Sequence, residues 1–389
     1  MKIGPFGSAL KKEYFVEEGI KVYAQENAFT GDFSMGDYYI TEDKYKELKS
    51  CELYPGDLVI SMMGTIGACA IFPKNAEKGI MNSHLLRLQF NNEVIPEYIM
   101  YLLRDSVLIR KQIDRLSVGS IMSGLSSSVV KKLVFPISKL AEQKRIVEYL
   151  DSIDHLITLH QCKCDQAKIL KKYMLQKMFP QNDEKVPKIR FKSFTDDWEQ
   201  RKLGDYLEVS KEKNRDALFG KEDVLSVSGE FGIVNQIEFQ GRSFAGVSVA
   251  NYGVVEVEDV VYTKSPLKSN PYGIIKTNKG KSGIVSTLYA VYKPKNNVDS
   301  EFVQIYFELD SRMNSYMHPL VNKGAKNDMK VSDENALKGP VIFPSIEEQK
   351  TISQYFDKLN CLITLHQHKC EELKNIKKFM LQNMFVQEK

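Results

Sequence analysis

A run of lysines without any acidic residue is the clearest chemical feature of this sequence. Between Asp259 and Asp299 there is no Asp or Glu, and glycine and proline between Pro266 and Gly283 predict a loop over much of the stretch. Lysine ammonium groups bind phosphate oxygens, and polar loop side chains reach base edges. We therefore expect contact with DNA or RNA here. The lysines are Lys264, Lys268, Lys276, Lys279, Lys281, Lys293 and Lys295, interleaved with Tyr262, Tyr272, Tyr289 and Tyr292.

Motifs for catalysis are incomplete. NKGKS at Asn278 resembles a phosphate-binding loop, but Ile275 stands where that loop needs a glycine. SNPYG at Ser269 lacks the second proline of the amino-methyltransferase motif, and GxSxG, HExxH and a glycine-rich methyl-donor loop do not occur. Four of the six histidines fall on predicted long helices, which leaves little for acid–base catalysis. We expect no catalytic activity.

The chain contains an internal repeat. Glu142–Phe179 returns as Glu348–Phe385 at a constant offset of 206, with 22 of 38 positions identical, including the block LITLHQ from Leu156. Each copy follows a less similar region of about 140 to 165 residues. Weaker matches in the same order, such as Asp57 with Asp259, indicate two versions of one domain.

The two similar segments predict long helices that pair with each other. Apolar or small residues recur in a four–three alternation typical of a coiled-coil seam, with one slip near Leu170. A helix must bury such a stripe, so we expect an antiparallel coiled coil of the two repeats. The predicted seam is Ile146, Leu150, Ile153, Ile157 and His160 in the first copy, and Ile352, Phe356, Leu359, Ile363 and His366 in the second.

The seam histidines also suggest a metal site, since HxCxC begins at His160 and HxHxxC at His366. On a helix only residues such as i and i+4 share a face, so Cys162 points away from His160, and the CxxC spacing of zinc modules is absent. Polar seam residues that set the register are the favoured interpretation, with no metal bound.

The less similar regions predict α/β (α+β) domains of mixed sheet plus helix. The first has strands within Leu53–Phe72 and Ser83–Phe90 and a helix over about 96–116. The second has strands from Val254 and from Ser282 and a helix over about 300–316. Low similarity between the domains beside high similarity between the helices suggests two different ligands on one shared scaffold.

Composition excludes several classes of protein. Hydrophobic residues are 43 % and charged residues 27 %, as in globular domains, and the net charge of +4 balances 54 basic against 50 acidic residues. Six cysteines are too few for a disulfide framework, no apolar h-region follows Met1, and no apolar run approaches the roughly 20 residues of a membrane span. We expect a cytoplasmic protein without a membrane partner.

Two divergent domains alternating with two similar helices resemble the specificity (S) subunit of type I restriction-modification enzymes. DWEQRKLGDYLE at Asp197 is similar to the family's opening of a target recognition domain, and PGDLVISMMGTIG at Pro55 to its central strand pair. The Phe-Pro then Glu-Gln-Lys joins at Phe135–Lys144 and Phe343–Lys350 are similar to its entries into the spacer helices.

The resemblance implies a non-catalytic reader of double-stranded DNA. Each target recognition domain would read half of a bipartite sequence, and the helix pair would fix the spacer. Two modification (methyltransferase) subunits would methylate adenine N6, and two restriction (translocase/nuclease) subunits would translocate and cleave DNA. S-adenosylmethionine, ATP and Mg are expected on those partner subunits, with no cofactor on this chain.

The resemblance also implies domain boundaries. The first recognition domain would span 1–138, the first spacer helix 139–180, the linker 181–193, the second recognition domain 194–344 and the second spacer helix 345–387. The family pattern places a counterpart of Phe191–Asp205, including Trp198, before the first domain, so that domain is expected to be shortened by about 25 residues at its start.

Within this scheme, loop lysines would contact phosphates while polar side chains reach bases in the major groove. The loop VNKGAKNDMK from Val321 and its serine-rich counterpart from Val118 could both enter a groove, although the latter could equally be a simple connector. The candidate DNA-binding residues are Lys264, Lys268, Asn270, Tyr272, Lys276, Lys279, Lys281, Lys323 and Lys326, and in the first domain Ser61, Thr65, Ser83, Ser120 and Ser123.

Two other functions compete with this interpretation. A coiled-coil adaptor whose two sheet domains bind proteins would explain the helices but not the acid-free lysine stretch. A self-contained DNA modification enzyme would need a methyl-donor site that the sequence lacks.

Overall fold

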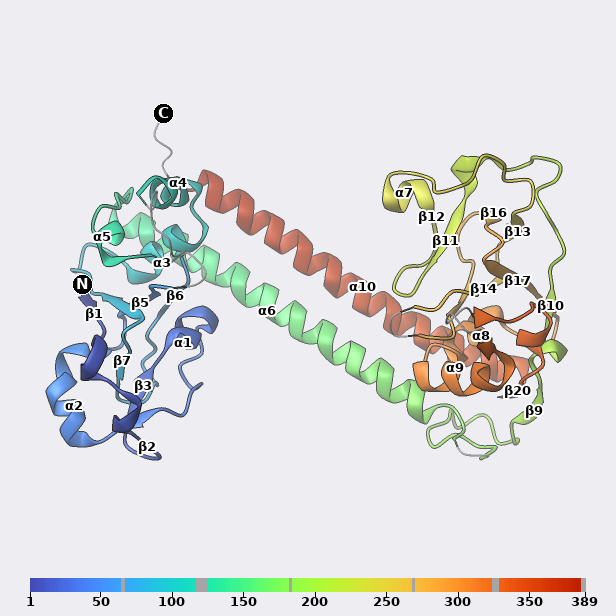
Figure 1. Ribbon diagram of the computed structural model, residues 1–389, viewed down its shortest axis with the longest axis horizontal. Coiled ribbons are helices and arrows are strands. Elements are labelled where there is room, and N and C mark those ends of the chain that lie inside the picture. The colour runs from blue at the N-terminus through green and yellow to red at the C-terminus, as the bar shows by residue number, and fades with distance from the viewer. Residues whose placement is uncertain (64–66, 117–124, 182–183, 268–269, 324–328, 386–389) are drawn as a thin grey trace. The chain divides into compact units, whose positions relative to one another are not determined.

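The computed structural model describes residues 1–63, 67–116, 125–181, 184–267, 270–323 and 329–385 (Figure 1). The chain divides into two compact units. Unit 1 contains Met1–Gln161 and His368–Lys389, and unit 2 contains Cys162–Gln367. Two helices of 38 residues each, α6 (Leu140–Lys177) and α10 (Ile346–Asn383), contribute one part of their length to each unit.

The described part of unit 1 holds short strands and five shorter helices in addition to its parts of α6 and α10. Its strands are β1 (Lys2–Ile3), β2 (Phe15–Val16), β3 (Ile20–Tyr23), β4 (Tyr39–Ile40), β5 (Leu58–Ser61), β6 (Cys69–Ile71), β7 (Gly79–Met81) and β8 (Leu85–Leu88). Its helices are α1 (Gln25–Thr30), α2 (Glu42–Leu48), α3 (Pro96–Asp105), α4 (Val107–Leu116) and α5 (Ser127–Val130).

Unit 2 is richer in strands. These are β9 (Glu199–Lys202), β10 (Leu207–Val209), β11 (Leu225–Ser228), β12 (Gly232–Asn235), β13 (Gly253–Val255), β14 (Val260–Thr263), β15 (Ile275–Thr277), β16 (Gly283–Val285), β17 (Tyr289–Pro294), β18 (Asn322–Lys323), β19 (Met329–Lys330) and β20 (Pro340–Phe343). Its helices are α7 (Gln236–Gln240), α8 (Ser300–Tyr306) and α9 (Asp310–Met317).

Both units contain the same four-stranded antiparallel sheet. The strand order is β1-β8-β5-β6 in unit 1 and β10-β17-β14-β15 in unit 2. A buried aspartate precedes each of the equivalent strands β5 and β14. The Asp57 carboxylate accepts the backbone N–H of Tyr54, and the Asp259 carboxylate accepts that of Glu256, both at 2.8 Å. The sequence match of these two aspartates therefore reflects one shared turn.

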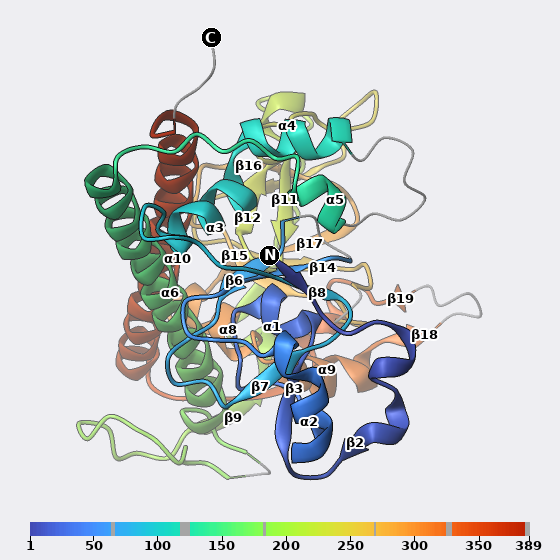
Figure 2. The same ribbon diagram turned by 90° about the vertical axis from the view of Figure 1, so that its left-hand side faces the viewer.

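Alternating side chains put a separate core on each face of these sheets. In unit 1, Leu58 and Ile60 pack toward α3, α4 and the long helices, whereas Val59 packs toward α1, α2, β3 and β7. Both views of the ribbon place α3 and α4 on one side of this sheet and α1 and α2 on the other (Figure 1, Figure 2). In unit 2, Val260 belongs to the core shared with α8, α9 and the long helices, and Val261 to a smaller core with β11, β13 and β16.

The long helices pair in opposite directions within each unit, as predicted. In unit 1 the seam residues Ile146 and Leu150 near the start of α6 share a core with Leu381 near the end of α10. In unit 2, Leu175 near the end of α6 shares a core with Ile352 and Phe356 near the start of α10. The described seam residues are all buried or half-buried. The expected mixed α/β fold with an antiparallel helix pair is therefore confirmed.

The expected slip in the seam at Leu170 is wrong. Leu170 is exposed, and the four–three alternation continues without interruption through Lys171, which is largely buried. The same holds one repeat later, where Ile376 is exposed and Lys377 occupies the seam. A lysine can stand there because its methylene stem packs while a carboxylate neutralises its ammonium group.

Three further sequence-based expectations are corrected. The helix expected over 96–116 is interrupted at Ser106, which has an extended backbone, and the helix over 300–316 is interrupted between α8 and α9. The loop expected between Pro266 and Gly283 contains β15, because Ile275 and its neighbours pair with β14.

Among the described residues, no helix is long and apolar enough to cross a membrane.

Candidate nucleic-acid interface

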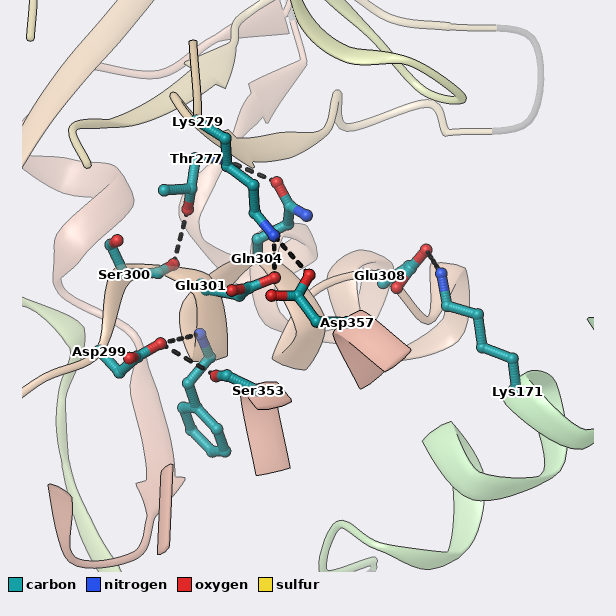
Figure 3. A network of polar contacts seen from close by, with 11 residues as sticks. Lys171, Thr277, Lys279, Asp299, Ser300, Glu301, Gln304, Glu308, Ser353 and Asp357 are labelled. Atoms are coloured by element: carbon teal, nitrogen blue, oxygen red, sulfur yellow. Dashed lines mark hydrogen bonds and ion pairs between the residues drawn. The ribbon is translucent and has the colours of Figure 1, made fainter. Parts of the chain in front are cut away.

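Lys279 stands at the centre of a polar network in unit 2. Its ammonium group pairs with the carboxylate of Glu301 on α8 and, at 2.8 Å, with that of Asp357 on α10 (Figure 3). Lys279 thus joins the end of β15 to two helices. The side chain of this predicted DNA-binding residue is exposed, but two carboxylates of the protein already pair with its charge.

The network shifts the pKa of each of its members. The pKa of Glu301 is raised to about 7, mainly by burial and also by the hydrogen bond with Asp357, while Lys279 opposes the rise. Burial opposes the charge of Lys279, but its hydrogen bonds to Asp357 and Glu301 outweigh burial and raise its pKa. The Asp357 pKa is lowered because hydrogen bonds from Glu301 and Lys279 outweigh the effect of burial.

Uncharged contacts complete the same network. Gln304 accepts the backbone N–H of Thr277 at 2.9 Å, and the Thr277 hydroxyl donates to the Ser300 carbonyl at 2.6 Å (Figure 3). The Asp299 carboxylate caps α8 and also accepts the hydroxyl of Ser353 on α10 at 2.9 Å. The sheet, α8 and α10 are therefore fixed to one another inside unit 2.

Three other lysines of the acid-free stretch also have partners. Lys264 pairs with Asp333 at 2.9 Å, and Lys293 pairs with Glu256 at 2.8 Å and with Glu212. The Lys295 ammonium group donates to the backbone carbonyl of Gly204 at 2.6 Å. Acidic residues distant in sequence thus neutralise Lys264, Lys279 and Lys293, three of the seven lysines of a stretch that has no acidic residue of its own.

Asn270 and Tyr272 are largely buried. The Asn270 amide donates to the Asp310 carboxylate at 2.6 Å. The Tyr272 carbonyl accepts the hydroxyl of Tyr262 at 2.8 Å, and the Tyr272 ring lies edge-on to His318. Both residues therefore connect the loop between β14 and β15 to α9 or to the residue that follows it.

Lys276 and Lys281 are placed differently. Lys276 lies in β15, is 8 % exposed and lines a groove; its burial, with Lys171 and Lys279 nearby, lowers its pKa, although Glu308 opposes the shift. Lys281 is exposed and lines a second pocket of about 550 Å³ together with Glu222 and other acidic residues.

The remaining candidates are divided between described and undescribed parts of the chain. Lys323 lies in β18, which pairs with β19. In unit 1, Ser61 is buried and its hydroxyl donates to the Met63 carbonyl at 2.8 Å, whereas Ser83 is half-buried. Five candidates lie outside the described residues, namely Lys268, Lys326, Thr65, Ser120 and Ser123. DNA contact by any of these residues stays a prediction.

The sequence reasoning missed lysines on the long helix. Lys168 and Lys172 are exposed on α6 and line the same groove as Lys276. They belong to the repeated segment, which the sequence assigned to helix pairing alone. No group of three or more His, Cys, Asp or Glu residues that could hold a metal is found in the described part of the chain, which includes the half-buried His160 and His366.

Comparison with known proteins identifies the repeated domain. The family model of the type I restriction modification DNA specificity domain matches twice, at residues 4–168 and 195–375. These two matches together cover most of the chain; the second contains the whole unit 2 sheet and the first contains β5, β6 and β8 of the unit 1 sheet.

Individual relatives agree with the family match. A chain assigned as the type I restriction enzyme MjaX specificity subunit of Methanocaldococcus jannaschii is 26 % identical over 365 residues, covering 87 % of this chain and 80 % of that protein. The MjaIX specificity subunit of the same organism is 28 % identical over 201 residues, covering 46 % and 42 %.

A solved structure agrees in fold. The S subunit of a type I restriction-modification system from M. genitalium has a TM-score of 0.56 at 14 % identity, covering 100 % of this chain and 94 % of that one. The duplicated sheet, the paired repeat helices and the double family match lead to one conclusion. The chain belongs to the type I restriction-modification DNA specificity family and is a specificity subunit that recognises DNA.

Proposed function

We propose that this subunit reads a bipartite DNA sequence, one half with the sheet domain of each unit, and that partner subunits methylate adenine N6 and restrict DNA at that target. The observation that carries the proposal is the duplicated sheet with the same strand order in both units. A duplicated scaffold with diverged side chains is suited to reading two different short sequences.

Corresponding positions of the two sheets differ in chemistry. Ala70 pairs with Val59 on β5, and Lys276 pairs with Val261 at the equivalent place on β14. One buried position is thus apolar in unit 1 and cationic in unit 2. This divergence supports different half-targets, while the long helix pair would fix the length of the unread spacer.

Exposed leucines on the repeated helices support the proposed partners. Leu156 and Leu159 of unit 1 are 41 % and 38 % exposed, and their repeat counterparts Leu362 and Leu365 of unit 2 are 47 % and 62 % exposed. Apolar side chains that are identical in both repeats yet face solvent are typical of a partner surface. Each unit carries one copy of this leucine surface, so the chain has one proposed binding surface for each of two modification subunits.

The proposed division of labour leaves the chemistry to the partners. Two modification subunits would bind S-adenosylmethionine, and two restriction subunits would use ATP and Mg, whereas this chain would be non-catalytic. Such a complex acts on cellular DNA, so we place it in the cytoplasm.

The experiment is methyl transfer in vitro with purified components. The modification subunit is incubated with labelled S-adenosylmethionine and genomic DNA, with or without this chain. We expect a stable assembly and label on adenine N6 only when both proteins are present. A failure to assemble, together with label that does not depend on this chain, would refute the proposal and favour the adaptor function.

A further inference from the structure

Lys276 is a buried cation of unit 2. It is 8 % exposed, and no ion pair or hydrogen bond of its ammonium group is found among the described residues. A buried ammonium without a partner is costly, and its pKa is lowered accordingly. A protein that keeps such a lysine requires a reason outside simple packing.

The side chain lines a groove of about 790 Å³ that lies entirely within unit 2. The end of α6 forms one wall, α8 and α9 form the floor with Gln304 and Glu308, and the β11–β12 turn from Gly229 to Ile233 closes another side. Asn360 and Thr364 on α10 add uncharged polar groups. The groove therefore combines lysines with uncharged side chains that can donate hydrogen bonds.

Two of the four carboxylates that line the groove are neutralised by lysines. Glu308 pairs with Lys171 at 2.5 Å (Figure 3) and Asp357 with Lys279 at 2.8 Å. Asp310 accepts the Asn270 amide at 2.6 Å, as described above.

Three lysines of the lining have no carboxylate partner among the described residues. Lys168 and Lys172 on α6 are exposed, and neither they nor Lys276 has an ion pair within the part of the chain that the structure describes. Glu230 and Asp310 are the two carboxylates of the lining for which no ion pair is found in that same part, and Asp310 accepts an amide hydrogen bond. The groove thus has an excess of unneutralised positive charge.

We propose that this groove binds a phosphodiester of the DNA backbone, with Lys276 at its base and Lys168 and Lys172 at its rim. The inference rests on the DNA-recognition function proposed above and adds the helix pair to the DNA-contacting surface. A phosphate would restore the partner that the buried ammonium lacks. Because Ala70 replaces Lys276 in unit 1, the buried contact belongs to unit 2 alone.

The test measures DNA affinity of the full chain assembled with its modification subunit. A duplex of mixed sequence is titrated over a range of salt concentrations for the unchanged chain, for Lys168→Ala/Lys172→Ala and for Lys276→Met. Each lost phosphate contact should reduce the slope of log K against log salt by about one. The matched control is Lys358→Ala, an exposed lysine of α10 that does not line the groove.

Thermal unfolding separates binding from packing. Lys276→Met removes a desolvated charge, so the variant should unfold at an equal or higher temperature while binding DNA more weakly. A lysine with a structural role would instead lose thermal stability. Lys168→Ala/Lys172→Ala changes exposed helix positions and keeps the test valid if Lys276→Met fails to fold.

The outcomes distinguish this inference from the proposed function. Slopes unchanged in both groove variants, with the unchanged complex still binding DNA, would overturn the groove alone. Groove variants that no longer bind the modification subunit but keep the same salt slope of DNA binding would indicate that the groove binds an acidic protein surface. That result would also overturn the inference. No DNA binding by the unchanged complex would refute the proposed function itself.

Discussion

Gln143 and Gln349, separated by the repeat offset of 206 residues, are buried side chains that make the same three hydrogen bonds, each within its own unit. The Gln143 side-chain oxygen accepts the backbone N–H of Ile95 at 2.9 Å. Its amide donates to the carbonyls of Glu93 at 3.0 Å and Ser138 at 2.8 Å. Gln143 is fully buried. It thereby ties the start of α6 to the turn that begins α3.

Gln349 repeats this arrangement in unit 2. It accepts the backbone N–H of Asp299 at 3.0 Å and donates to the carbonyls of Asn297 at 3.4 Å and Pro344 at 2.9 Å. The start of α10 is thereby tied to the turn that begins α8. The Glu-Gln-Lys string of both repeats thus has a structural purpose, which is to orient a sheet domain on its own helix.

Removing either glutamine should destabilise its unit. Gln349→Ala removes the partner of the Asp299 N–H, of the Asn297 carbonyl and of the buried Pro344 carbonyl, which should lower the free energy of unfolding of unit 2 by about 1–3 kcal/mol. Urea unfolding followed by fluorescence measures this directly, since Trp198 is the sole tryptophan and is buried in unit 2. Gln161→Ala, at an exposed helix position, is the control, and equal losses in both variants would contradict the assigned role.

The seam lysine of unit 1 should also contribute to stability. Lys377 pairs with Asp154 at 2.7 Å and with Asp105 at 3.9 Å, and burial raises the pKa of Asp105. Lys377→Met removes the only charge that the seam supplies to these carboxylates, which should cost about 1–3 kcal/mol. Calorimetry of the Lys377→Met and exposed Lys378→Met chains tests this. A smaller loss at 377 than at 378 would argue against the pairing.

The sequence predicted the repeat architecture well because its signal is local. Seam positions such as Leu150 and Phe356 repeat at helical spacing, and the glycine- and aspartate-bounded apolar runs around Asp57 and Asp259 form the expected strands. Periodicity and turn chemistry are properties of neighbouring residues, so they can be read without a structure.

The candidate site was less accessible to sequence reasoning because charge pairing is not local. Lys279 stands in a stretch without acidic residues, yet its two carboxylate partners come from 22 and 78 residues further along the chain. Conversely, Lys168 and Lys172 sit in a helix whose periodicity explains only its buried side. Identifying the cations that stay unpaired required the fold.

The carboxylates around Lys279 should make the stability of unit 2 depend on pH. The pKa of Glu301 is about 7 in the folded chain, above its ordinary value of 4.5, so its contribution is complete below pH 4.5 and is lost as pH rises through 7. Glu301→Gln cannot ionise. Its stability relative to the unchanged chain should therefore rise by roughly 1–2 kcal/mol between pH 5 and pH 8.

Urea unfolding followed by Trp198 fluorescence at both pH values gives this difference. Glu347→Gln, which removes an exposed carboxylate from the first turn of α10, should show no comparable rise. A Glu301→Gln chain whose relative stability is the same at pH 5 and pH 8 would show that Glu301 ionises normally.

The exposed leucines of the repeat should govern assembly with modification subunits. Leu159→Glu and Leu365→Glu each place a charge on one copy of the proposed partner surface without disturbing the core, since both positions face solvent. Each single variant should bind one modification subunit, and the double variant none. Light scattering of the purified complexes gives the stoichiometry. Full assembly of the double variant would place the partner surface elsewhere.

Reading of a bipartite target is the central claim, and mapping methylated adenines in cells that carry this chain and its modification subunit tests it most directly. We predict a single motif of two short specific halves at a constant spacing, with methylated adenine N6 and complete loss of the marks when this chain is absent. A continuous motif, or marks that persist without the chain, would contradict the account.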